Sequence, residues 1–264
     1  MGNAAITLPL QRLGFEVWPI DTVRFSNHPA HGSHTGQITH PDEITALVDG
    51  IEQRGLLGSC TAILSGYLGS AVNGHALSKI VDRVKTKNKR ALFMCDPVMG
   101  DNGQPYVEKD ILAFFKGNSP GPADILTPNN YEASVLIGVP VDCRQNAIAA
   151  IKTLRATGVK IAIITGIETD SGIETIAGDE KGAWLISTPK VPVASHGAGD
   201  LFSALFLAKY LLENSTPHAL SYAVSAVYDV LNFAQRNGTA DLPIVAAQDF
   251  ILSPQTQFAA EPAA

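Results

Sequence analysis

The feature that most constrains this chain is an uninterrupted, mostly apolar segment, residues 201–212, that directly follows the glycine-rich turn 196–200. A helix that is apolar on all sides is stable in water only when other elements cover it, so this segment predicts a helix inside a layered domain. The two glycines of the turn allow tight bending and leave backbone N–H groups bare where the helix begins. Bare amides and the helix dipole favour an anion, and a phosphate fits such a place.

Asp200 brings a carboxylate to the same turn. A fixed negative charge would repel a permanently bound phosphate, but a base that takes a proton from a hydroxyl beside a migrating phosphoryl group belongs there. The alternative is that Asp200 only caps the helix, because aspartate is favoured at N-caps and in first turns. The turn therefore indicates phosphoryl transfer to an alcohol and leaves the capping role open.

Length and composition fit one α/β domain. The chain has 264 residues, 45% of them hydrophobic and 17% charged, which is enough apolar material for a sizeable core. We expect one domain over 1–252 and a disordered tail over 253–264. A net charge of −6 argues against nucleic acid or an anionic membrane as a partner. Three scattered cysteines, and no apolar run of the roughly 18 residues that a membrane span needs, favour a cytoplasmic location.

Strand-like and helix-like periods alternate along the chain. Strands are expected at 15–20, 61–65, 91–95, 124–127, 160–165 and 183–187, and helices at 4–13, 42–54, 71–85, 130–137 and 147–156, with a polar loop at 21–40. This alternation predicts a three-layer αβα domain whose mostly parallel central sheet has helices on both faces.

Polar groups stand where four of these strands end. They are Ser-Gly-Tyr at 65–67, Asp-Pro at 96–97, Thr-Pro-Asn at 127–129 and Thr-Gly at 165–166. In an open α/β sheet the ligand crevice lies outside the carboxyl ends of the strands. We therefore expect these groups to converge with the glycine turn on one site.

Two of these positions have a structural explanation as well as a chemical one. Asp96 ends an apolar strand, where an aspartate needs a cation or a donor; magnesium would supply the first, and turn amides the second. Asn129 and Glu132 stand three apart at a helix start, so they match a capping box as well as a carboxylate that holds a magnesium-bound water. The residues alone leave both alternatives open.

The polar loop contains three histidines, His28, His31 and His34, at a spacing of three. Histidines form metal sites when the backbone presents them together. A proline and two glycines in the same stretch predict a mobile loop, so we expect no metal site there.

Five segments together resemble a known family. They are Phe-Ser-Asn-His at 25–28, Ser-Gly-Tyr-Leu-Gly-Ser at 65–70, Cys-Asp-Pro-Val-Met-Gly-Asp at 95–101, Thr-Pro-Asn-Asn-Tyr-Glu at 127–132 and Gly-Ala-Gly-Asp at 197–200. In this order they are similar to the pyridoxal kinases of the ribokinase-like superfamily, over nearly the whole chain. The last two segments carry elements shared across the superfamily, whereas the first two are more specific to pyridoxal kinases.

The resemblance implies ATP-dependent phosphorylation of the 5'-hydroxymethyl group of pyridoxal, and by extension of pyridoxine and pyridoxamine, in the salvage of pyridoxal 5'-phosphate. It makes Asp200 the catalytic base. The implied phosphate cradle is Gly197, Ala198 and Gly199; the substrate-binding residues are Tyr67, Ser26 and His28; the ATP-binding residues are Asp96, Asn129, Glu132, Thr165 and Asp101; and the metal-binding residues are Asp96 and Glu132. Residues 100–106 resemble a lid over the ATP site.

The implied cofactors are ATP and Mg²⁺, with K⁺ as an optional monovalent ion, and the implied assembly is a homodimer. The chain departs from many relatives at Pro29, where they have threonine, and at His34, where they have an aromatic residue. Both departures concern the acceptor and leave phosphoryl transfer untouched.

Two alternative functions remain. A hydroxymethylpyrimidine kinase shares the fold and the base, but segment 65–70 argues against it. A non-catalytic pyridoxal phosphate binding protein would have no use for Asp200 as a base facing a phosphate.

The start of the chain, residues 1–5, resembles the beginning of the first helix in pyridoxal kinases, after their first strand. In the family, as the resemblance implies, a strand and its turn of roughly 15 to 20 residues precede this helix. The chain is then either a tolerated short variant or the product of a start codon assigned too late, and we expect the second. On this expectation the 264-residue form is poorly soluble or nearly inactive, and an N-terminally extended form carries the activity.

Overall fold

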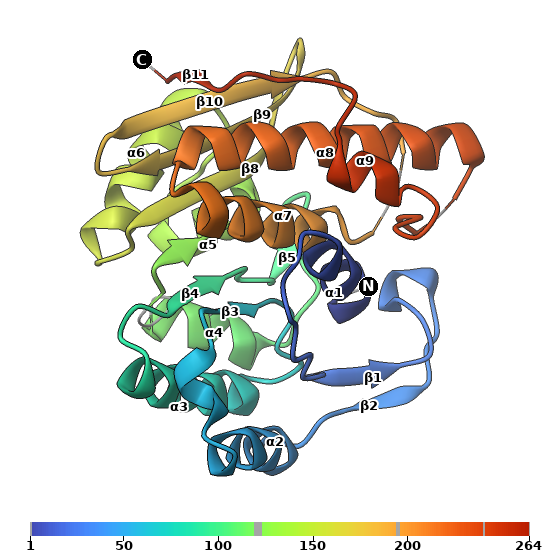
Figure 1. The fold of residues 1–264 in the computed structure, drawn as a ribbon. Helices are drawn as coiled ribbons and strands as arrows, with labels where there is room; N and C mark the ends of the chain where they lie inside the picture. The colour runs from blue at the N-terminus through green and yellow to red at the C-terminus, as the bar shows by residue number, and fades with distance from the viewer. Residues whose placement is uncertain (1, 119–122, 194–195, 240, 264) are drawn as a thin grey trace.

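The computed structural model of the chain describes residues 2–118, 123–193, 196–239 and 241–263. These residues form a three-layer αβα domain around a seven-stranded central sheet (Figure 1). The predicted fold class is confirmed. Within the described ranges, no helix is both long and apolar enough to cross a membrane.

The central sheet has a parallel half and an antiparallel half, in the order β11-β10-β9-β8-β7-β4-β3. The parallel strands are β3 (Ala62–Ser65), β4 (Leu92–Cys95), β7 (Ile125–Leu126) and β8 (Ile161–Thr169). The antiparallel strands are β9 (Gly172–Asp179), β10 (Gly182–Thr188) and β11 (Glu261–Pro262). Because the parallel strands run in one direction, their carboxyl ends share one edge of the sheet, where the predicted polar groups lie.

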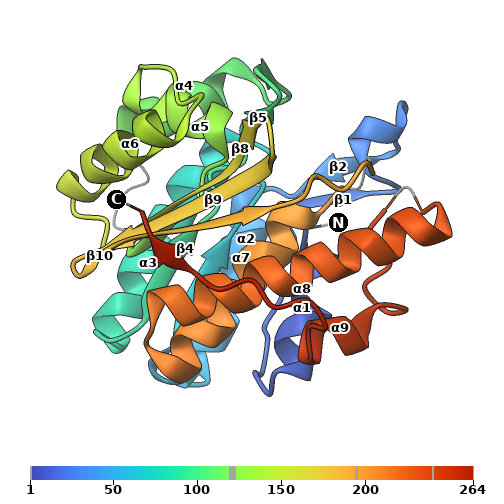
Figure 2. The same ribbon diagram turned by 90° about the horizontal axis from the view of Figure 1, so that it is seen from above.

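Helices cover both faces of the sheet (Figure 2). One face carries α1 (Asn3–Arg12), α7 (Ala198–Glu213), α8 (Thr216–Asn237) and α9 (Gln248–Leu252); the other carries α3 (Ala71–Lys87), α4 (Lys109–Asn118), α5 (Asn130–Ile137) and α6 (Arg144–Ala156), with α2 (Pro41–Gln53) packed on α3. The strands divide their side chains between the two cores. Ile161 and Ile163 pack toward α7 and α8, while Ala162 and Ile164 pack toward α6, as the two-residue period of a strand requires.

Helix α7 is the interior helix that the apolar segment predicted. Residues 201–208 are all buried, between the sheet, α8 and α1. A helix covered on all sides holds its first turn in a fixed position relative to the sheet edge. This fixed position places the glycine turn beside the ends of β3 and β4.

Three local predictions are wrong. Residues 15–20 are extended but pair with no described strand, because Phe15 and Val17 pack against α1 and α7 instead. The expected loop 21–40 contains a hairpin, β1 (Val23–Phe25) with β2 (Gly36–Ile38). Strand β9 was missed, since the glycines and acidic residues in its sequence obscure the apolar alternation.

The C-terminal segment lies against the domain through residue 263, which differs from the disorder expected for 253–264. The Asp229 carboxylate accepts hydrogen bonds from the Gln255 and Thr256 amides and from the Thr256 hydroxyl. Further along, β11 pairs with β10 at the edge of the sheet. Backbone hydrogen bonds to α8 and β10 therefore hold a segment whose composition alone suggests a tail.

Candidate active site

The glycine turn and the start of α7 have the geometry of an anion site. Gly197 has a left-handed backbone, with φ 97° and ψ 6°, and α7 begins at the next residue, Ala198. No side chain of the described chain caps this helix start. The first-turn N–H groups therefore have no acceptor within the helix, and Gly199 in this turn lies close to Asp96 at the sheet edge.

Asp200 lies in this first turn but does not cap it. Its Oδ2 accepts a hydrogen bond from the Gly2 amide at 2.9 Å. A Cβ placed on Gly66 would lie 3.4 Å from Asp200 Oδ1, so the turn after β3 closely approaches the carboxylate. Burial raises the pKa of Asp200, although the Gly2 hydrogen bond opposes the rise. A half-buried carboxylate with a raised pKa is suited to accept a proton from an alcohol.

Asp96 lies directly beneath the cradle, at the carboxyl end of β4, with 7% of its surface exposed. A Cβ on Gly199 would stand 3.7 Å from Asp96 Oδ2. Ser203 Oγ donates to the same oxygen at 3.4 Å, and Ser203 Oγ lies 3.1 Å from Thr127 Oγ1. Asp96 is thus held by a long hydrogen bond from α7, and it faces the place where an anion would bind.

Asn129 and Glu132 form a capping box at the start of α5. Asn129 Oδ1 accepts from the Glu132 amide, and Glu132 Oε2 accepts from the Asn129 amide, both at 2.9 Å. The box also reaches the loop after β4, because Glu132 Oε1 accepts from the Met99 amide at 2.9 Å and Asn129 Nδ2 donates to the Gly100 carbonyl at 2.8 Å. Asn129 and Glu132 therefore do cap α5, and their hydrogen bonds to Met99 and Gly100 hold the first residues of the predicted lid in place.

Thr165 lies beside this box. It forms an isolated parallel bridge with Asn129, and its amide donates to the Pro128 carbonyl at 3.1 Å. The register of β8 against β9 shifts between Ile164 and Ile167, so Thr165 stands at a bulge. Bulges re-aim side chains near functional sites. The structure thus brings the expected nucleotide-side residues Asp96, Asn129, Glu132 and Thr165 to one edge of the sheet.

Three carboxylates share this edge: Asp96 and Glu132 are buried, and Asp200 is half-buried. Burial first, and then the charges of Glu132 and Asp200, raise the pKa of Asp96 well above its ordinary value. Burial raises the pKa of Glu132 to about 7 even though three backbone amides stabilise its charge. The site is therefore strongly negative in the ionised state, and a cation would relieve the repulsion.

The donor set fits a magnesium ion that is held mainly by other ligands. In the part of the chain that the structure describes, no group of three or more His, Cys, Asp or Glu side chains is arranged to hold a metal ion. Magnesium is usually bound through one or two carboxylates together with water and phosphate oxygens. Asp96, with its single long hydrogen bond from Ser203, has lone pairs available for such a role, whereas both oxygens of Glu132 already accept backbone hydrogen bonds.

The predicted lid is a short hairpin, β5 (Gly100–Asp101) with β6 (Gln104–Pro105). Asp101 is exposed and accepts from the Asn102 amide at 2.8 Å, within its own turn. Tyr106, at the end of the hairpin, is 59% exposed, and its amide donates to the Met99 carbonyl at 3.1 Å. The hairpin therefore stands next to the acidic site without closing it.

The expected acceptor-side residues lie on two loops. Tyr67 follows β3 and is half-buried; burial and the charge of Glu108 raise its pKa. Ser26 Oγ accepts from the Thr35 amide at 3.0 Å and lies 2.6 Å from Asn27 Oδ1, so it holds its own loop together.

The third acceptor-side residue, His28, stacks on the ring of His196 with centroids 4.3 Å apart. The ring of His31 also contacts the ring of His196, edge-on, whereas the ring of His34 packs on Phe25. The three histidines of the loop thus do not gather at one point.

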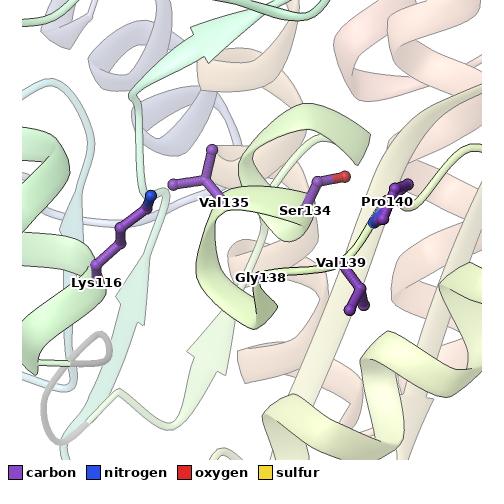
Figure 3. Close-up of a pocket in the computed structure, with 6 residues that line it drawn as sticks. All are labelled: Lys116, Ser134, Val135, Gly138, Val139 and Pro140. Carbon is purple, nitrogen blue, oxygen red and sulfur yellow. The ribbon is translucent and has the colours of Figure 1, made fainter.

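A separate hollow of about 390 Å³ lies between α4 and α5 (Figure 3). Ser134 and Val135 of α5 line it, together with Lys116 of α4 and residues 138–140 that follow α5. It is at the opposite end of α5 from Asn129, about 12 Å away along an eight-residue helix. The hollow therefore does not belong to the acidic site.

The sequence did not predict three features of the site: the hydrogen bond from Ser203 to Asp96, the closeness of Gly66 to Asp200, and the stacking of His196 on His28. Ser203 lies one helical turn after Asp200, on the same face, and this spacing could have identified it. The other two depend on loops that meet only in the folded chain.

Comparison with known proteins agrees with this geometry. A family model described as phosphomethylpyrimidine kinase matches residues 59–244, so fold and site together define a small-molecule kinase of the ribokinase-like class.

Curated relatives give a finer assignment. The pyridoxal kinase PdxY of Rubrobacter xylanophilus is 40% identical over 98% of this chain and 91% of the relative, and that of Deinococcus radiodurans is 42% identical over 99% and 91%. A solved structure of Leishmania donovani pyridoxal kinase in complex with ADP and pyridoxamine has a TM-score of 0.90 and 25% identity, covering 99% of this chain and 94% of that one. The chain belongs to the pyridoxal kinase family.

Proposed function

We propose that the chain transfers the terminal phosphoryl group of ATP to the 5'-hydroxymethyl group of pyridoxal, and that pyridoxine and pyridoxamine are also acceptors. The observation that carries this proposal is the place of Asp200: a half-buried carboxylate of raised pKa in the uncapped first turn of α7, where the helix-terminal amides have no acceptor within the helix. The relatives named for pyridoxal and the neighbour solved with ADP and pyridoxamine support the choice of substrates.

In the proposed reaction Asp200 accepts the proton of the acceptor hydroxyl as the hydroxyl oxygen forms its bond to the γ-phosphorus of ATP, and the bond from that phosphorus to the β–γ bridging oxygen breaks, so that ADP leaves. The amides of the cradle, Gly197, Ala198 and Gly199, stabilise the charge on the phosphoryl oxygens during transfer, because they are already oriented and need no reorganisation. Asp96 would hold the magnesium of bound ATP, directly or through water, and the ion would neutralise phosphate charge. Glu132 keeps the lid base and Asn129 in place.

The test is Asp200→Asn, which keeps size and removes basicity. We expect turnover to fall by roughly 10²- to 10⁴-fold, the typical contribution of general-base catalysis, with ATP affinity nearly unchanged. Asp249→Asn is the matched control, since the side chain of Asp249 is 96% exposed on α9, far along the chain from the site. Parent-like turnover in Asp200→Asn would mean that Asp200 is not the base.

Three finer points are part of the proposal. Magnesium is the required divalent ion, and chelation should abolish turnover until Mg²⁺ is restored. K⁺ is the monovalent ion to compare with Na⁺ in the same assay. The active form is a cytoplasmic homodimer, and light scattering at assay concentration tests the assembly.

A further inference from the structure

A cluster of four side chains joins the acceptor-side loop to the glycine turn. We call His28, His31, His196 and Asp241 the histidine cluster. The rings of His28 and His196 are stacked, 4.3 Å between centroids and 7° from parallel. His31 meets both rings edge-on, at 6.2 Å from His28 and 5.5 Å from His196. Asp241 Oδ1 lies 3.0 Å from His31 Nε2.

The backbone connects the histidine cluster to the reacting end of the site. His196 directly precedes Gly197, the N-cap of α7, and pairs with Asp241 in a parallel bridge. The opposite side of the cluster is the loop of the β1–β2 hairpin, where the Ser26 amide donates to the Thr35 carbonyl at 2.8 Å and the His31 amide donates to the His28 carbonyl at 3.0 Å. Two stretches distant in sequence thus meet through ring contacts.

We propose that His196, together with His31 and Asp241, is a positioning group that holds His28 at the acceptor side of the site. This inference rests on the proposed function, because His28 touches the acceptor only if the acceptor binds beside Asp200. His196 acts through His28 and not on the reacting atoms. Because His196 and Gly197 are adjacent in the chain, the stack also couples the position of the β1–β2 loop to the position of the phosphate cradle.

The geometry of the histidine cluster favours stacking over metal binding. Two parallel rings face each other with their π-surfaces, whereas metal ligands direct ring nitrogens at a common point.

Neutral rings fit the stack. Burial first, and then the charge of His196, lower the pKa of His28, and the charge of Asp241 opposes them. Two imidazolium rings at 4.3 Å would repel each other.

The test compares His196→Ala, which removes the ring, with His196→Phe, which keeps a flat ring. His218→Ala is the control, because the His218 side chain is 74% exposed on α8 and outside the cluster. Calorimetry measures the Kd of pyridoxal in the presence of a non-hydrolysable ATP analogue, and the Kd of the analogue alone. Proton NMR follows the titration of the His28 ring in each variant without any ligand.

We expect pyridoxal to bind roughly two- to tenfold more weakly to His196→Ala, the range that one aromatic pair supplies, with analogue binding unchanged. His196→Phe should restore pyridoxal affinity, and the pKa of His28 should rise in His196→Ala. The positioning role would be overturned if His196→Ala weakened the binding of pyridoxal and of the analogue equally, or if His196→Phe did not restore pyridoxal binding. An unchanged His28 titration in His196→Ala would overturn it as well. A parent chain that binds the analogue but not pyridoxal would overturn the proposed acceptor instead, and the NMR titration would still test the stack.

Discussion

The buried carboxylate of Glu132 should make the stability of the ligand-free protein depend on pH. Its pKa is raised from 4.5 to about 7 on folding. A group with a raised folded pKa contributes stability that is complete below its unfolded pKa and is lost as the pH rises through its folded pKa. At 1.36 kcal/mol per pH unit, the free energy of unfolding should fall by about 3 kcal/mol between pH 4.5 and pH 7 on account of this residue.

Glu132→Gln should remove this dependence. The pKa of Asp96 should also fall toward its ordinary value in the variant, because the charge of Glu132 contributes to its rise. This change further weakens the dependence of the free energy of unfolding on pH. The amide has one acceptor where the carboxylate has two, so either the Met99 or the Asn129 N–H loses its partner. That loss costs about 1–3 kcal/mol at every pH and shifts the curve without changing its slope.

The assay is thermal unfolding from pH 4.5 to 8 without nucleotide or divalent ions. For a chain of this size, about 3 kcal/mol corresponds to roughly 6–12 °C in melting temperature. Glu180→Gln, at an exposed position in the β9–β10 turn, is the control and should follow the parent. Parallel curves for the parent and Glu132→Gln would refute the reasoning, because Glu132 would then ionise alike in folded and unfolded chains.

Other changes test neighbouring parts of the site and the fold. Glu132→Gln removes a negative charge that acts on Asp96, so it should also raise the Mg²⁺ concentration for half-maximal rate; a melting shift alone, with unchanged Mg²⁺ dependence, would assign Glu132 to the capping box only. Gly66→Ala would bring a methyl group to 3.4 Å from Asp200 Oδ1, so turnover should fall with little change in melting temperature; parent-like turnover would contradict the close approach. Asp229→Ala removes the acceptor for three hydrogen bonds from residues 255–256, and we expect about 2–4 kcal/mol lower stability in urea titration and faster proteolysis of 253–263; an unaltered digestion pattern would argue against this anchor.

The sequence was sufficient to predict those parts of the structure that local chemistry determines. The apolar segment 201–212 could only be an interior helix, and α7 is one. The polar strand ends converge because parallel strands end on the same edge, so Asp96, Asn129 and Thr165 were predictable as neighbours.

Contacts between distant loops were not predictable. The stack of His28 on His196 and the Asp241 contact depend on how three separate loops meet, and no spacing in the sequence encodes that. Strand β9 escaped prediction because its Glu174 is buried in an ion pair with Arg144 of α6, where a polar residue normally indicates exposure.

The most direct test of the central claim is acceptor-dependent ATP turnover with pyridoxal and with hydroxymethylpyrimidine, measured on the 264-residue chain and on an N-terminally extended form. We predict Mg²⁺-dependent phosphorylation of pyridoxal, in preference to hydroxymethylpyrimidine, and loss of this activity in Asp200→Asn. A preference for hydroxymethylpyrimidine in either form, or turnover of neither acceptor by both forms, would contradict it.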